Sequence, residues 1–444
     1  MRILWVSNVI LSDFARDHGL PHAVVGGWVE GSYARIKEEK NHRSGDGEER
    51  LITLAVCFPV PQNLSECKVI KDGVTFYGFS EDPEAPEEYD PSLEERFRRI
   101  VEDFEPDIMH IFGTEYAHTL AAVRAFDNPE KTLIGISGLC TEIADVYMAD
   151  LPYSVQRARS FRDIVRKDSL KEQQQKFRKR AKMEKEALMK TAHITGRTSF
   201  DRRVTNQINP DAVYHPMNET LRTPFYEGSW YPSEIEPYSI FMSQGDYPLK
   251  GLHFMLQAMP YILDQFPSAH LYVAGNSIIG DLGGGKASTS KYPLAVRITA
   301  YGRYLRRLIR QLRLEKHVTM LGKLPAEAMK ERYLKSHVYV CPSVLENSPN
   351  SLCEAMLLGM PVVAAKVGGI PDFISDGEDG ILFPSGRYKE LAEGINTFFY
   401  DVALGEMLGS RAKKKARITH NPDTNYLRLL EIYRSMLSVR PTSK

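Results

Sequence analysis

The sequence has no excess of charge of either sign, since 57 Lys and Arg balance 57 Asp and Glu over 444 residues. A strongly basic field is therefore missing, and we expect no nucleic-acid partner. No apolar run reaches the length of a membrane span. The chain opens on a β-type run, Ile3 to Val6, without the apolar region and cleavage site of a signal peptide.

Cysteine is scarce and shows no metal-binding or disulfide spacing. The five cysteines contain no C-x-x-C pair, and three of them lie in apolar, strand-like runs. This pattern suits reduced thiols, so we expect cytoplasmic residence. No Asp-x-Asp lies at a strand end near the motifs below, and we expect neither a metal nor a cofactor. No G-x-G-x-x-G follows the first strand, which disfavours a dinucleotide-dependent dehydrogenase.

The length and the alternation of short apolar runs with helical patterns predict an α/β protein of two domains. A Pro-rich, aliphatic-poor stretch between Tyr214 and Tyr238 predicts the linker. We therefore place a first domain at 1–222 and a second at 223–420. A terminal helix follows at 421–444, with apolar residues at helical spacing from Leu427 to Leu437.

The most informative stretch runs from Val338 to Gly369. It reads as strand, polar loop, helix and strand of a parallel sheet, with Gly359 and Pro361 ending the helix. Glu346 lies in the loop, and Glu354 lies eight positions later in the predicted first helical turn. Between them, the backbone N–H groups of the helix N-terminus form an anion site. An alternative interpretation is an ordinary capping box of Ser351 and Glu354, with Glu346 as a solvated acid.

Glu346-x7-Glu354, followed by Gly359-Met360-Pro361 and by Gly368-Gly369, resembles the signature of retaining family-4 glycosyltransferases. The resemblance implies the GT-B architecture, in which two Rossmann-like domains face each other across a cleft and the terminal helix crosses back to the first domain. It also implies transfer of a sugar from a nucleoside diphosphate, with retention at the anomeric carbon. The donor is a substrate, and a UDP-sugar is the first expectation.

The resemblance assigns roles to several residues. Glu346 would orient the transferred sugar, and Glu354 would meet the ribose. The donor diphosphate would be bound by Lys250 and Gly251, by the glycine pair Gly26 and Gly27, and by Asn350, Ser351 and Leu352. The backbone of the turn formed by Gly322, Lys323 and Leu324 would contact the nucleotide base. The family commonly has Arg-x5-Lys-Gly where this chain has Gln244 and Lys250, and Arg197 is our candidate for the missing cation.

The first domain carries weaker signals for the acceptor or the sugar. His110 and Glu115 lie where a predicted strand ends, in a pattern similar to one in a bacterial branch of the family. A buried structural histidine is the alternative for His110. Gly138 stands where many members have a histidine, so that residue's role has no counterpart here.

The segment from Arg157 to Lys190 holds 13 Lys and Arg against 5 Asp and Glu. It reads either as a solvated helical face or as a peripheral contact with an anionic membrane at the inner face. The predicted function is transfer to a glycan, a lipid-linked or a small-molecule acceptor. A sugar-nucleotide epimerase or hydrolase and a non-catalytic, membrane-associated scaffold are the alternatives.

Overall fold

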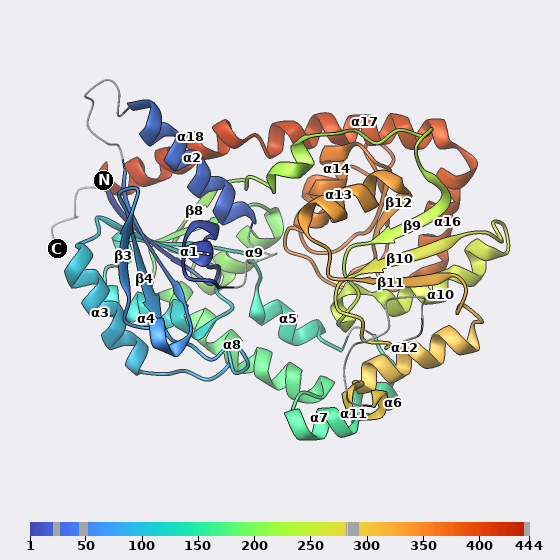
Figure 1. The fold of residues 1–444 in the computed structure, drawn as a ribbon, viewed down its shortest axis with the longest axis horizontal. Helices are drawn as coiled ribbons and strands as arrows, with labels where there is room; N and C mark the ends of the chain where they lie inside the picture. The colour runs from blue at the N-terminus through green and yellow to red at the C-terminus, as the bar shows by residue number, and fades with distance from the viewer. Residues whose placement is uncertain (21–26, 44–51, 149, 281, 283–292, 439–444) are drawn as a thin grey trace. The chain divides into compact units, whose positions relative to one another are not determined.

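The computed structural model describes residues 1–20, 27–43, 52–148, 150–280, 282 and 293–438 (Figure 1). Their contacts divide the chain into two units. Unit 1 comprises Met1–Glu142, Lys176–Arg222 and the chain from His420 onward. Unit 2 comprises Ile143–Gln175 and Thr223–Thr419.

Unit 1 is built on an eight-stranded sheet in the order β3-β4-β2-β1-β5-β6-β7-β8. Its strands are β1 (Arg2–Ser7), β2 (Thr53–Pro59), β3 (Lys68–Lys71), β4 (Val74–Phe79), β5 (Ile108–Phe112), β6 (Thr132–Gly135), β7 (His193–Gly196) and β8 (Val213–Pro216). All neighbours pair in parallel except β3 and β4. The central strands are buried along nearly their whole length, which explains their continuous apolar runs.

Unit 2 holds a six-stranded parallel sheet in the order β11-β10-β9-β12-β13-β14. Its strands are β9 (Glu236–Met242), β10 (His270–Ala274), β11 (Val318–Gly322), β12 (Ser336–Cys341), β13 (Val362–Ala365) and β14 (Ile381–Phe383). Numbered within the unit, this is the doubly wound order 3-2-1-4-5-6, which reverses between β9 and β12. Such a reversal point is where open α/β sheets bind ligands.

Helices connect the strands in both units. In unit 1 they are α1 (Ser12–Asp17), α2 (Gly27–Arg43), α3 (Ser92–Phe104), α4 (Ala117–Phe126), α9 (Ser199–Ile208) and α18 (Pro422–Ser438). In unit 2 they are α6 (Tyr153–Gln156), α7 (Phe161–Arg166), α10 (Leu252–Leu263), α11 (Leu294–Arg297), α12 (Ala300–Gln311), α13 (Ala326–Lys335), α14 (Asn350–Leu358), α15 (Ile370–Phe373), α16 (Tyr388–Tyr400) and α17 (Val402–Thr419). Two helices, α5 (Cys140–Val146) and α8 (Leu170–Met189), run through the points where the chain changes unit.

The last helix belongs to the core of unit 1. The hydroxyl of Tyr433 in α18 accepts a hydrogen bond from Trp5 Nε1 of β1 at 2.9 Å, and it lies 2.7 Å from His110 Nδ1 of β5. Tyr433 and Leu430 are almost fully buried there. The chain changes unit between Arg222 and Thr223, but the structure groups Ile143–Gln175 with unit 2, which differs from a first domain spanning 1–222.

Candidate active site

The reversal point of the unit 2 sheet brings two of the predicted residues together. Lys250 follows β9 in the turn Pro248–Lys250, and Glu346 lies in the loop after β12. Lys250 Nζ is 2.6 Å from Glu346 Oε1, and Ser343 Oγ donates a second hydrogen bond to the same oxygen at 2.7 Å. The sequence separation of 96 residues is thus closed by the sheet order.

The Lys250 ammonium is held charged in a mostly buried position. Burial disfavours its charge, but the carboxylate of Glu346 and the neighbouring Tyr247 outweigh that cost and raise the pKa of Lys250 well above its usual value. The Tyr247 ring centroid lies 5.6 Å from Lys250 Nζ. An ammonium has three donors, so the bond to Glu346 leaves capacity for a phosphate oxygen.

Two glycines allow the loops around this pair to approach one another. Gly251 has a φ of +72°, and a Cβ there would lie 1.8 Å from the carbonyl oxygen of Pro342. Gly368 has a φ of +51°, and a Cβ there would lie 1.9 Å from the carbonyl oxygen of Glu346. The next residue, Gly369, donates its N–H to that same oxygen at 3.0 Å. The glycines of both predicted motifs therefore serve to position Lys250 and Glu346.

Helix α14 follows the Glu346 loop and begins at Asn350. Its N-cap is Pro349 and no side chain caps it, so the capping-box interpretation of Ser351 and Glu354 is wrong. Leu352 donates its N–H to the carbonyl of Pro349 at 3.0 Å, so it is not the unpaired donor that we expected. Glu354 lies in the second helical turn rather than the first, and it is 2% exposed.

Asn350 and Ser351 begin α14, as an anion site at the helix N-terminus requires. The Ser351 hydroxyl accepts a hydrogen bond from Tyr339 Oη at 3.0 Å, and its carbonyl accepts one from Tyr333 Oη at 2.8 Å. These tyrosines fix the backbone of the first turn. The binding of a diphosphate by Asn350 and Ser351 stays a prediction.

The remaining donor assignments are distributed over both units. Gly322 ends β11 with a φ of +77° in open space, and Lys323 and Leu324 follow it. Gly26 lies outside the described residues. Gly27 begins α2, where a Cβ would meet the side chain of Arg222 at 2.2 Å, so close packing within unit 1 explains this glycine.

Arg197 and His110 line one small cavity of unit 1, about 30 Å³ in volume. Arg197 Nη1 pairs with Glu219 Oε2 at 2.6 Å, and both side chains are almost fully buried. Burial lowers the pKa of His110 to about 3, and its Nδ1 is engaged by Tyr433. A cavity of this size admits a water rather than a sugar. The surroundings of His110 therefore match the alternative of a buried structural histidine.

Glu115 and Gly138 do lie together, where β5 and β6 end. A Cβ on Gly138 would lie 2.8 Å from Glu115 Oε1, so the glycine makes room for this carboxylate. Burial raises the pKa of Glu115. A second buried acid, Glu184 of α8, accepts hydrogen bonds from Thr114 Oγ1, from the N–H of Cys140, and from the N–H and hydroxyl of Thr141, at 2.6–2.8 Å.

The sequence reasoning missed three polar residues of these sites. Glu184 lies within the basic segment, and the sequence does not indicate its role because its hydrogen-bond partners are far away along the chain. Ser343 holds Glu346, and Ser348 is buried with its hydroxyl unpaired among the described residues. Both serines lie between Pro342 and Pro349, just beyond the carboxyl end of β12. Polar residues at that position are a signal that the sequence does offer.

Among the described residues, no cluster of His, Cys, Asp or Glu is arranged to hold a metal ion. No helix in the described ranges is both long and apolar enough to cross a membrane.

Comparison with known proteins agrees with this geometry. Residues 232–415, which include both Lys250 and Glu346, match the family model described as glycosyl transferases group 1. An uncharacterized glycosyltransferase of Methanocaldococcus jannaschii is 27% identical over 185 residues, which is 42% of each chain. A D-inositol 3-phosphate glycosyltransferase of Streptomyces bingchenggensis is 27% identical over 169 residues, 38% of this chain and 34% of that protein. The matched segment spans less than half of these relatives.

Solved structures extend the likeness of the fold to the whole chain. Sucrose-phosphate synthase from Thermosynechococcus elongatus superposes with a TM-score of 0.69 and 17% identity, covering 99% of this chain and 100% of that one. HepE from Anabaena, in complex with UDP-glucose, gives a TM-score of 0.64 at 17% identity, covering 98% and 100%. The two Rossmann-like sheets of this protein form the GT-B fold, as the sequence predicted.

Proposed function

We propose that the protein is a retaining, metal-independent glycosyltransferase of family 4. It would move a sugar from a nucleoside-diphosphate sugar, most simply a UDP-sugar, to a glycan, lipid-linked or small-molecule acceptor. The observation that carries this proposal is the Lys250–Glu346 pair at the reversal point of the sheet, within the residues that match the glycosyl transferases group 1 model. HepE, with which the chain shares its fold, is described with UDP-glucose bound. This supports UDP as the first nucleotide to test.

The proposed chemistry needs no covalent nucleophile from the protein. The bond between the anomeric carbon and the diphosphate oxygen breaks, and the acceptor hydroxyl oxygen bonds that carbon on the same face. The acceptor proton passes to the departing diphosphate. Lys250 and the first turn of α14 stabilise the negative charge that develops there, and Glu346 orients the sugar. Arg197 remains our candidate for a second cation, which would require it to leave Glu219.

A thermal-shift screen of UDP-, GDP- and ADP-sugars tests the proposal. A ligand at 100 times its dissociation constant stabilises the fold by about 2.7 kcal/mol, so one nucleotide should raise the Tm clearly above the others. Turnover of that donor should persist in excess EDTA. Sugar release or epimerisation without an acceptor would indicate a hydrolase or an epimerase, and binding without turnover would indicate a scaffold.

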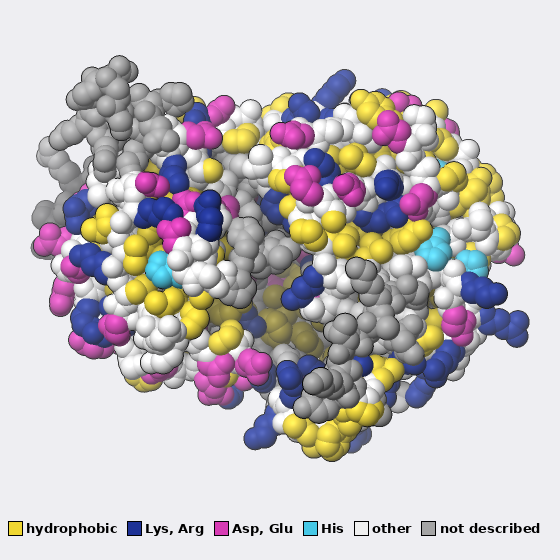
Figure 2. Space-filling model, viewed as in Figure 1, with side chains coloured by type: hydrophobic (Ala, Val, Ile, Leu, Met, Phe, Trp, Pro, Cys, Tyr) yellow, Lys and Arg dark blue, Asp and Glu magenta, His cyan; other side chains and the backbone are white. Residues whose placement is uncertain are grey.

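We also propose that the protein contacts an anionic membrane through what we name the α6–α7 surface. Its apolar members are Tyr153, Phe161, Ile164 and Val165, which are 59–69% exposed. Its basic members are Arg157, Arg159, Arg166 and Lys167, which are also exposed. In Figure 2, hydrophobic side chains flanked by Lys and Arg gather where Figure 1 draws α7. Exposed apolar groups ringed by cations suit insertion at a lipid interface.

The proposed membrane-contact surface is smaller than the whole segment from Arg157 to Lys190 that the sequence suggested. Several basic residues of α8 within unit 1 are engaged with acidic partners or carbonyls: Lys176 with Glu87, Lys179 with Glu88, and Arg180 with the carbonyl of Glu115. The whole segment from Arg157 to Lys190 is therefore not one free basic face. The proposed contact lies on unit 2, at the cytoplasmic face of a membrane, and it combines apolar insertion with charge.

A further inference from the structure

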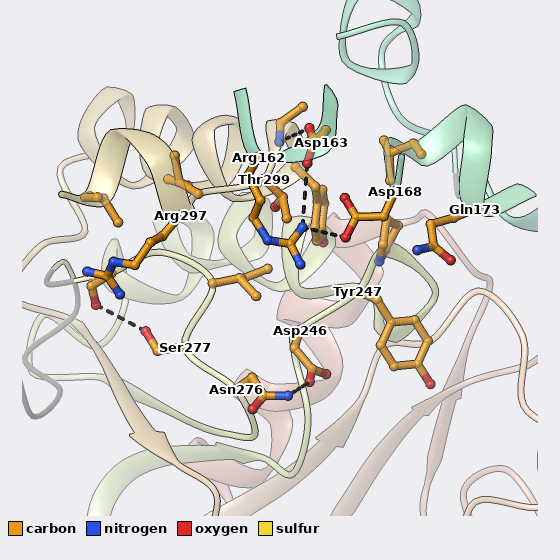
Figure 3. A pocket seen from close by; sticks show the side chains of 18 of the residues that line it. Arg162, Asp163, Asp168, Gln173, Asp246, Tyr247, Asn276, Ser277, Arg297 and Thr299 are labelled. Atoms are coloured by element: carbon orange, nitrogen blue, oxygen red, sulfur yellow. Dashed lines mark hydrogen bonds and ion pairs between the residues drawn. The ribbon is translucent and has the colours of Figure 1, made fainter. Parts of the chain in front are cut away.

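A polar cavity of about 610 Å³ lies within unit 2 (Figure 3). Its walls come from the 162–173 stretch of α7 and α8, from the loop Asp246–Pro248 after β9, from residues 276–280 after β10, and from the start of α12. The volume falls within the range of about 300–1,000 Å³ that small-molecule sites occupy. Neither Lys250 nor Glu346 lines it, so it is distinct from their site.

Three carboxylates of the wall each have one oxygen that accepts no hydrogen bond. The Oδ1 atoms of Asp163, Asp168 and Asp246 are buried and accept no hydrogen bond from any described residue, although Arg162 Nη1 lies 3.7 Å from Asp163 Oδ1. The other oxygen of each is engaged, by the N–H of Ala300 at 2.8 Å, by Arg162 Nη1 at 2.8 Å, and by Asn276 Nδ2 at 2.9 Å. Asp163 is only 1% exposed. Buried acceptors without donors are costly and uncommon, and each one calls for a partner.

The charged and polar side chains of the cavity wall indicate which kind of ligand the cavity suits. Three carboxylates face two arginines, Arg162 and Arg297. Because Arg162 is already paired with Asp163 at 3.7 Å and with Asp168 at 2.8 Å, a diphosphate would meet net repulsion. An apolar ligand would leave the carboxylate oxygens unpaired. An uncharged ligand rich in hydroxyl donors satisfies them. The wall also supplies neutral polar groups and three aromatic rings for C–H faces: Gln173, Asn276, Ser277, Tyr147, Tyr247 and Tyr301.

We propose that this cavity binds a neutral saccharide, as part of the glycosyl acceptor. The inference deepens the proposed function and rests on it for the word acceptor, although saccharide binding stands on the cavity itself. Tyr247 lines the cavity and also faces Lys250, with 5.6 Å between the ring centroid and Nζ. A sugar held in the cavity therefore lies next to the proposed donor site, within the same unit.

Direct titration of the full chain tests the proposal. Glucose, galactose, mannose, N-acetylglucosamine, maltose and lactose would be titrated by saturation-transfer NMR, with glucuronic acid as the anionic probe. We expect at least one neutral saccharide to bind and glucuronic acid to bind more weakly. Asp168→Asn and Asp246→Asn should each weaken binding roughly 10- to 100-fold, because each removes a charged acceptor. Asp264→Asn, the same change at an exposed position outside the cavity, should have no effect.

Three results would overturn the inference: no binding of any neutral saccharide, equal affinity in the variants and the wild type, or displacement of the saccharide by UDP. Donor turnover in the same proteins separates this inference from the proposed function. If the wild type turns over a donor while the variants keep its saccharide affinity, the cavity assignment fails and the function stands. If the wild type neither binds nor turns over a donor, the function fails, and the titration still decides the cavity.

Discussion

Lys250 and Glu346 form a largely buried ion pair. Their side chains are 19% and 11% exposed, and the ion pair joins them at 2.6 Å. Removing one member of a buried pair leaves the other charge uncompensated, which typically costs about 3–5 kcal/mol of stability. Variants at either position must therefore be compared by ligand affinity together with the Tm, so that a loss of fold is not taken for a loss of function.

For Lys250→Ala, donor affinity should fall by roughly one to two orders of magnitude, because a charge-assisted contact to phosphate is worth about 1.5–3 kcal/mol. Calorimetric titration of the nucleoside diphosphate measures this. Lys316→Ala, at an exposed position of the same unit, is the matched control and should bind normally. Unchanged affinity in a folded Lys250→Ala protein would place the phosphates elsewhere.

The two glutamates should separate in steady-state kinetics. Glu354 is proposed to meet the ribose, which is bound alike in ground state and transition state, so Glu354→Gln should raise the donor KM with little change in kcat. Glu346 is proposed to meet the sugar ring as positive charge develops. Glu346→Gln should therefore lower kcat by about two orders of magnitude or more and leave nucleotide binding nearly intact. The reverse pattern would swap the two roles.

At the scale of elements, the sequence predicted most of what places the site. The strand, loop, helix and strand from Val338 onward could be recognised because a buried parallel strand is a continuous apolar run and glycine or proline ends each element. The residue at which α14 begins was harder to predict from the sequence. Pro349 is its N-cap without any side-chain bond, and such an N-cap leaves no capping signature to read.

The segment Ile143–Gln175 could not be assigned to unit 2 from sequence. Its attachment rests on contacts distant along the chain, such as the bond from the N–H of Ala300 to Asp163 Oδ2 and the bond from Arg303 to the carbonyl of Arg159. Local composition shows only a basic, helical stretch. For that reason the cavity between α7 and α12 had no sequence signal.

The α6–α7 surface leads to a prediction for this element. Replacing Phe161, Ile164 and Val165 by serine removes apolar side chains that make no part of the core, so the Tm should hold. Binding to vesicles with anionic lipid should fall by at least about tenfold, because apolar burial and charge both contribute to interfacial binding. Sedimentation with anionic and zwitterionic vesicles measures it.

Reversing the charges of Arg157, Arg159, Arg166 and Lys167 should likewise abolish binding to anionic vesicles while leaving turnover on a soluble acceptor intact. Equal sedimentation of wild type and both variants would return the surface to the interpretation of a solvated face.

For the whole molecule, the two-domain α/β architecture could be predicted from the chain length and from the alternation of apolar runs with helical patterns. The strand order of each sheet came only from the structure. Strand order depends on pairings between distant segments, and periodicity carries no information on them. The Lys250 and Glu346 motifs could nevertheless be predicted separately, because each was recognised by its own local chemistry. The sheet order then brings the two side chains together.

Acid should destabilise unit 1, because burial lowers the pKa of His110 to about 3 and those of His215 and His420 to about 4. In the unfolded chain these groups titrate near 6.5, so from pH 6.5 down towards 4 the unfolded state binds more protons. Stability is therefore present above pH 6.5 and is lost as pH falls through this window. Each histidine contributes up to about 1.36 kcal/mol per pH unit.

Chemical denaturation at several pH values between 7 and 4 measures this slope. His110→Gln keeps a polar side chain that does not titrate, so its slope should be shallower by about one proton. A slope equal to that of the wild type would show that His110 is protonated in the folded state.

The hydrogen bond between Trp5 and Tyr433 has a consequence for synthesis, since it joins residues 428 positions apart. During translation, the first strands of unit 1 emerge long before α18, and all of residues 223–419 must be made in between. At about 5–20 residues per second, that interval lasts about 10–40 s. Throughout it the nascent chain lacks the helix that covers Trp5, and its apolar face is open to chaperones on the ribosome. Unit 2, whose sheet is complete by Phe383, can fold first.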